Sequence, residues 1–159
     1  MFNFKKIVAG IAVGAMVMGS GVAAFAGNGI LADNGKTVQF AAYYGSTQTW
    51  AAAPYDMNDA NIASADYDSE TGEYVLALKT GSYVMPYATM SGTIKAVYTD
   101  AELTEEVSID LDGDGYADEV SMAPGTETTN HYYLQLEAGA NSSSGDNHTM
   151  TQEVYLLVQ

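Results

Sequence analysis

The segment "IDLDGDGYADEV", residues 109–120, gathers carboxylates in a spacing that suits a bound cation. With Asp110 counted as position 1, aspartates fall at positions 1, 3, 5 and 9, and glycine falls at position 6. Calcium prefers about six to eight oxygen ligands at about 2.3 to 2.6 Å, and alternate residues of a tight loop can all point inward. The spacing predicts a calcium site whose ligands are Asp110, Asp112, Asp114, the backbone carbonyl of Tyr116, and Asp118.

This segment resembles two groups of calcium loops, the EF-hand and dockerin type and the hairpin loops of integrin-like propeller repeats. It departs from the EF-hand at position 12, where Ser121 replaces the bidentate glutamate, and strand-like sequences flank it. The hairpin type is therefore the closer likeness, and the missing ligand favours weak affinity in the extracellular range. Alternation along a strand should turn Glu119 away from Asp118. The alternative is a solvated acidic turn, because Asp-Gly pairs are common in hairpins.

The N-terminus has the pattern of a cleaved export signal. Lys5 and Lys6 precede an uncharged apolar run, and Ala24-Phe25-Ala26 places small residues where a signal peptidase reads them. A membrane anchor is the alternative, since the run is nearly long enough to span a bilayer. We expect residues 1–26 to be removed and residues 27–159 to form one domain. The product should be secreted, in the periplasm or outside the cell.

Composition narrows the function classes. All 20 acidic residues follow residue 26, where the basic residues are only Lys36, Lys79 and Lys95, and the whole chain has a formal charge of −15. Nucleic acids and anionic membrane surfaces are therefore improbable partners. There is no cysteine for disulfides, lipid attachment or Cys–His catalysis, and no nucleophile-elbow pattern. We expect a non-catalytic binding module of bacterial origin, whose extracellular ligand is a carbohydrate or a protein.

Alternating apolar and polar residues predict an all-β fold. About eight strands favour an antiparallel β-sandwich of immunoglobulin-like type, with a barrel as the alternative. The stretch 45–59 lacks strand alternation. The expected strands are residues 37–44, 62–67, 73–79, 92–99, 105–109, 116–122, 131–137 and 150–158.

Tyrosine is unusually abundant, with 12 residues beside a single tryptophan. Aromatic rings can stack on sugars or planar ligands, whereas the alternative is a set of partly buried tyrosines with solvated hydroxyls. The cluster that best fits a binding face is Tyr43, Tyr44, Trp50 and Tyr55.

A second tyrosine pair lies in "GSYVMPYATMSG", where Tyr83 and Tyr87 are spaced as Tyr-x-x-x-Tyr. With the preceding strands, this pattern resembles the near-iron-transporter (NEAT) domains, exported β-sandwiches that hold haem through a tyrosine. The resemblance implies haem as the alternative cofactor and this pair as its binding residues. In that family the pair lies on a late hairpin, whereas here it lies in the middle of the chain and Pro86 interrupts it.

Overall fold

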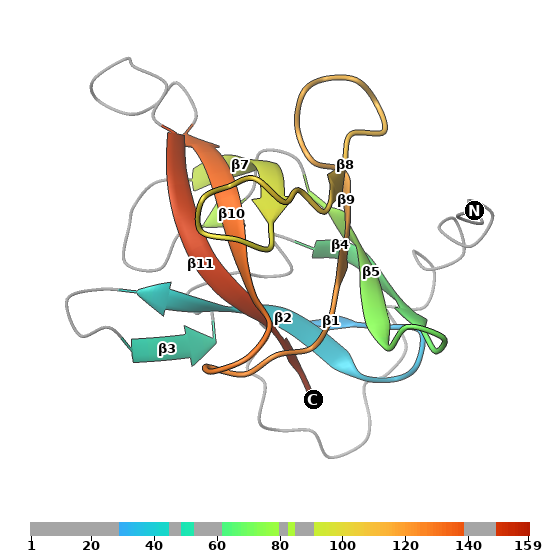
Figure 1. Ribbon diagram of the computed structural model, residues 1–159. Coiled ribbons are helices and arrows are strands. Elements are labelled where there is room, and N and C mark those ends of the chain that lie inside the picture. Colours follow the sequence, from blue (N-terminus) through green and yellow to red (C-terminus); the bar gives the residue numbers. More distant parts are fainter. Residues whose placement is uncertain (1–28, 45–48, 53–61, 80–82, 85–90, 139–148) are drawn as a thin grey trace.

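The computed structural model describes residues 29–44, 49–52, 62–79, 83–84, 91–138 and 149–159. The expected signal segment, residues 1–26, lies outside these ranges, so its cleavage stays a prediction. The described residues form eleven strands in two antiparallel sheets and contain no helix (Figure 1). The predicted all-β class is therefore confirmed, and the two sheets are consistent with a β-sandwich.

The larger sheet has seven strands and the smaller sheet has four. In spatial order the larger sheet contains β1 (Ile30–Leu31), β2 (Thr37–Tyr44), β11 (Thr149–Val158), β10 (His131–Ala138), β7 (Ser91–Tyr98) and β6 (Tyr83–Val84), with β3 (Thr49–Ala52) also paired to β2. The smaller sheet contains β4 (Ile62–Asp68), β5 (Glu73–Leu78), β9 (Glu119–Met122) and β8 (Ser108–Ile109).

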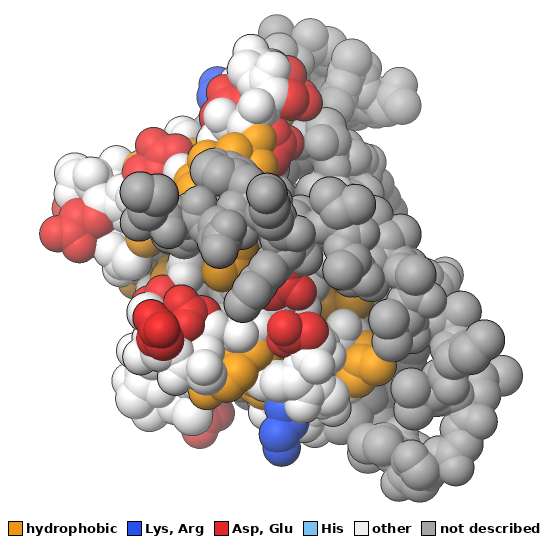
Figure 2. Space-filling model, turned by 90° about the vertical axis from the view of Figure 1, so that its right-hand side faces the viewer, with side chains coloured by type: hydrophobic (Ala, Val, Ile, Leu, Met, Phe, Trp, Pro, Cys, Tyr) orange, Lys and Arg blue, Asp and Glu red, His pale blue; other side chains and the backbone are white. Residues whose placement is uncertain are grey.

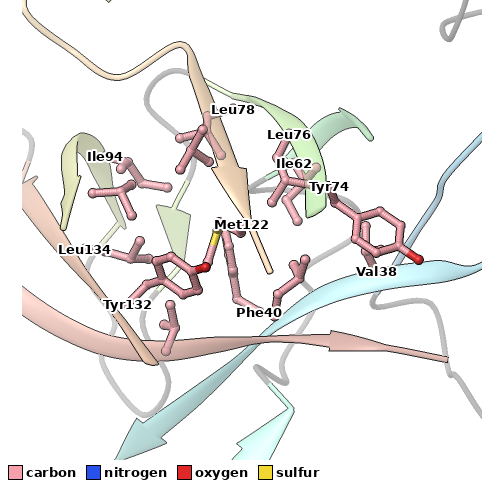
Figure 3. Close-up of a cluster of buried hydrophobic side chains, with 14 of the residues drawn as sticks. Val38, Phe40, Ile62, Tyr74, Leu76, Leu78, Ile94, Met122, Tyr132 and Leu134 are labelled. Carbon is pink, nitrogen blue, oxygen red and sulfur yellow. The ribbon is translucent and has the colours of Figure 1, made fainter. Parts of the chain in front are cut away.

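Side-chain alternation explains why these segments form strands and where the core lies. In β10 the side chains of Tyr132, Leu134 and Leu136 are buried, whereas those between them are partly exposed. Successive strand side chains point to opposite faces, so one face of each sheet is apolar. Figure 3 shows Phe40 from β2, Met122 from β9 and Tyr132 from β10 meeting in this core. The buried Tyr132 hydroxyl is satisfied, because it accepts a 2.8 Å hydrogen bond from the Ala123 amide.

The eight predicted strands are present, with ends that differ by a few residues. The largest differences, of three residues each, are at residues 105–109, of which only Ser108 and Ile109 form β8, and at residues 116–122, of which only Glu119–Met122 form β9. Three short strands, β1, β3 and β6, were not predicted. The expectation that residues 45–59 lack a strand was wrong at Thr49–Ala52, because β3 forms by pairing with β2 despite its weak alternation.

The fold places the acidic segment in the connection between β8 and β9. Figure 1 shows this loop projecting from the sheets at the opposite end of the molecule from β3. Within the described ranges, no helix is long and apolar enough to cross a membrane.

Candidate functional site

The acidic loop folds around its own carboxylates. Six successive backbone amides, those of residues 111–116, all donate to loop aspartates. Asp110 accepts from the amides of Gly113 at 2.8 Å and Gly115 at 3.3 Å, and one oxygen of Asp118 accepts from two others. Gly113 and Gly115 have φ angles of 79° and 87°, which residues with a Cβ rarely adopt. The glycines therefore permit the bends that direct the amides inward.

Three of the predicted ligands converge. Carboxylate oxygens of Asp110, Asp112 and Asp118 all lie within 4.8 Å of one another. Two oxygens bound to one calcium ion at about 2.4 Å can be at most about 4.8 Å apart, so these three meet the distance condition for one ion. Each carboxylate oxygen has two lone pairs. The amide bonds occupy both lone pairs of Asp118 Oδ2, but they leave Asp118 Oδ1 and at least one lone pair on each oxygen of Asp110 and Asp112 for a cation. The arrangement can therefore bind a cation while the amides hold the ligands in place.

The other two predicted ligands are placed differently. Asp114 is not part of the converging group, and its Oδ1 accepts a 2.8 Å bond from the Tyr116 amide. That bond lowers the pKa of Asp114, but desolvation and the negative charges of Asp112 and Asp118 outweigh it, so the pKa is raised overall. The Tyr116 phenol bonds to Glu137 on β10, and this bond is the main reason that its pKa is raised. The phenol therefore anchors the loop, which leaves the Tyr116 carbonyl as the predicted ligand.

Glu119 lies outside the group of three, as alternation predicts. Its side chain is only 6% exposed, and burial followed by the charge of Asp66 raises the pKa of its carboxyl. Its neighbours in the ladder are Ala77 on β5 and Ile109 on β8. Glu119 is thus a buried carboxyl of the smaller sheet rather than a loop ligand.

The C-terminal side of the loop is tied to both sheets. The buried Ala117 donates its amide to the Ile94 carbonyl on β7 of the larger sheet, at 3.1 Å. Asp118 donates to the Ile109 carbonyl and accepts from the Leu78 amide, which belongs to the smaller sheet. An ion that fixes Asp118 would therefore also fix a connection between the two sheets.

A second candidate site is a cluster of rings at the opposite end of the molecule. The Trp50 ring lies 5.0 Å from Tyr43, 4.8 Å from His131 and 5.2 Å from Tyr155, measured between ring centroids. All four side chains are half-buried. Ala41 pairs with Tyr155 in the sheet and is fully buried. Because the Ala41 side chain is small, it leaves room for the Trp50 indole to lie across it toward β10. These four residues are called the ring cluster below.

A hydrogen-bond network fixes one side of the ring cluster. His131 Nδ1 lies 3.1 Å from Glu153 Oε1, and Nε2 lies 3.1 Å from the Thr126 carbonyl oxygen. Glu153 also accepts from the Tyr133 hydroxyl at 3.3 Å. Burial, followed by the charge of Glu153 and this bond, raises the pKa of Tyr133, while burial and then the charge of Glu127 raise that of Tyr155.

The structure brings together only part of the predicted aromatic face. Tyr43 and Trp50 pair across β2 and β3 and are in ring contact. Tyr44 ends β2 and Tyr83 begins β6, and only their backbones are described. Tyr55 and Tyr87 lie outside the described residues, so the predicted haem pair stays untested. Sequence reasoning missed the two partners from distant strands, His131 and Tyr155, which no local spacing relates to Trp50.

Negative charge extends beyond the loop. Figure 2 shows Asp and Glu side chains recurring over the described surface on the side where β5 lies, with few Lys side chains among them. Within the described ranges, Lys95 forms an ion pair with Glu137 at 4.0 Å, and His131 Nδ1 lies 3.1 Å from the Glu153 carboxylate. An anionic partner would meet repulsion over such a surface.

Comparison of this chain with protein-family models, curated proteins and solved structures found no match.

Proposed function

We propose that this chain is an exported, non-catalytic binding module whose β8–β9 loop binds one structural calcium ion. The observation that carries the proposal is the convergence of the Asp110, Asp112 and Asp118 carboxylates within 4.8 Å. Hard oxygen ligands in this number and spacing suit calcium better than a soft transition metal. Asp114 and the Tyr116 carbonyl remain further proposed ligands.

The proposed role of the ion is to stabilise the fold. The loop carries several carboxylates whose mutual repulsion opposes a compact turn, and the six amides offset only part of that charge. A bound dication would neutralise them and secure the connections that Ala117 and Asp118 make to the two sheets. Calcium would then stabilise the scaffold that presents a ligand-binding face elsewhere.

Export and weak calcium affinity support each other. The N-terminal residues have the pattern of a cleaved signal, and the loop lacks the bidentate glutamate of tight sites. Dissociation constants of about 10⁻⁴ to 10⁻³ M are typical of extracellular calcium modules, which meet calcium at such concentrations. We also propose that the two sheets form a β-sandwich of immunoglobulin-like type. Its partner is an extracellular carbohydrate or protein.

Calorimetry and thermal melting test the calcium proposal directly. Calcium titrated into the chelator-treated protein should release or absorb binding heat with a stoichiometry near one, and it should raise the melting temperature. Magnesium should do so poorly, because it requires a smaller octahedral shell and dehydrates reluctantly. Identical melting temperatures in millimolar calcium and in chelator, with no binding heat, would show that the loop is only an acidic turn.

A further inference from the structure

A surface depression adjoins the ring cluster. It has a volume of about 380 Å³ and lies between the end of β7, the turn that precedes β10, and the first residues of β10. This volume is within the range of about 300 to 1,000 Å³ that is common for small-ligand sites. The depression is lined by Thr99, Thr128, Thr129, Asn130, His131, Tyr132 and Tyr133.

The lining is polar but contains no carboxylate, lysine or arginine. Threonine hydroxyls can both donate and accept, and an asparagine amide offers donors and an acceptor. Asn130 has a φ of 50°, a conformation that asparagine tolerates better than most residues, and its Nδ2 donates to the Pro124 carbonyl at 2.8 Å. The turn thus lines the depression with neutral hydrogen-bonding groups, and the Thr128 and Thr129 hydroxyls also lie 3.2 and 3.1 Å from the Thr126 hydroxyl.

His131 belongs to both features. His131 is one of the residues that line the depression, and its ring lies 4.8 Å from the Trp50 ring. Glu153 holds His131 and Tyr133 together through the two bonds to its Oε1. The depression and the ring cluster are therefore two parts of one surface, and this network fixes the groups at their boundary before any ligand arrives.

We propose that this surface is a binding site for a neutral oligosaccharide. A sugar ring has an apolar C–H face that packs on an aromatic ring, and a hydroxyl edge that bonds to groups such as those of the threonine turn. The ring cluster supplies the aromatic rings, and the depression supplies the hydrogen-bonding groups. Because the chain has 20 acidic residues against five basic ones, acidic glycans would be repelled. This inference rests on the proposal that the chain is a binding module, and it names the ligand class.

The test uses the full mature protein in saturating calcium, titrated with cellohexaose, xylohexaose, maltohexaose and chitohexaose. Trp50 is the only tryptophan, so its fluorescence reports on the site directly, and calorimetry measures affinity. At least one oligosaccharide should bind. Trp50→Ala should weaken that binding about tenfold or more, and Thr128→Val, which keeps the side-chain shape but removes the hydroxyl, should weaken it about threefold to tenfold.

Tyr67→Ala is the control for Trp50→Ala, because Tyr67 is likewise a solvent-accessible aromatic residue in ring contact with a neighbour, but it lies on β4 of the smaller sheet. The affinity of the Tyr67→Ala variant for the oligosaccharide should equal that of the wild type. The inference is overturned if none of the four sugars binds at millimolar concentration, if binding is insensitive to both site variants, or if only a cationic probe such as tetralysine perturbs Trp50. The calcium heat, measured on the same protein, shows separately whether the calcium proposal holds.

Discussion

Replacing Asp110 by asparagine should remove most of the calcium-dependent stability while leaving the calcium-free protein almost intact. The Asp110 carboxylate accepts from Gly113 at 2.8 Å and from Gly115 at 3.3 Å. Asparagine keeps one side-chain oxygen, so Asp110→Asn can retain the shorter bond and loses the longer one. A hydrogen bond contributes about 0.5 to 1.5 kcal/mol net, and the cost in chelator should fall at the low end of that range because the bond is long and exposed.

The cost in calcium is larger. An ion that binds only the folded state stabilises it by about 2.7 kcal/mol when its free concentration is a hundredfold above Kd. If the loss of one charged ligand raises Kd about a hundredfold, the same calcium concentration contributes only about 0.4 kcal/mol. The calcium-dependent gain should therefore fall by about 2.3 kcal/mol, which corresponds to a melting-temperature difference of several degrees.

Urea unfolding and thermal melts in calcium and in chelator measure this difference. Asp100→Asn is the matched control, because the Asp100 carboxylate also accepts several turn bonds, from Thr104 and Glu105, but is not part of the converging group. Asp100→Asn should lower stability equally in both buffers. The reasoning is refuted if Asp110→Asn keeps the wild-type calcium response, or if Asp100→Asn reduces that response as much.

Other predictions concern charge, core and processing. Hydrogen bonds from Thr104 and Glu105 lower the pKa of Asp100, so the ionised carboxyl stabilises the fold at neutral pH and this stabilisation is lost on acidification. The loss of melting temperature caused by Asp100→Asn should therefore shrink below pH 4. A loss that does not depend on pH would contradict this. Burial raises the pKa of Glu119, so its contribution to the free energy of unfolding is lost as the pH rises and the carboxyl ionises. Glu119→Gln should therefore raise the melting temperature at pH 7 but not in acid. A lower melting temperature of this variant at pH 7 would count against the prediction. Phe40→Ala, at 2% exposure, should cost about 3 to 5 kcal/mol in urea unfolding, whereas a cost below about 1 kcal/mol would mean a loosely packed core. Mass analysis of the secreted protein should find Gly27 at its N-terminus, and an intact Met1 would disprove cleavage.

Local patterns along the chain were enough to predict eight of the eleven described strands and the position of the acidic loop. Alternation is a property of neighbouring residues, so β2, β10 and β11 were predicted nearly to their ends. Ligand spacing in a tight loop is equally local, which is why Asp110, Asp112 and Asp118 could be named from their positions and do converge. The orientation of Glu119 followed from the same alternation.

The ring cluster and the depression were decided only by tertiary structure. Trp50 meets His131 and Tyr155 because β2 pairs with β3 on one side and with β11 on the other, and because β11 pairs with β10. Long-range register of this kind depends on which apolar faces pack together in the core, and no spacing within a single segment records it. The burial of Glu119 also depends on neighbouring strands. Local sequence patterns thus fixed most of the strands and a loop in which three carboxylates converge, while the pairing of distant strands decided which side chains share a surface.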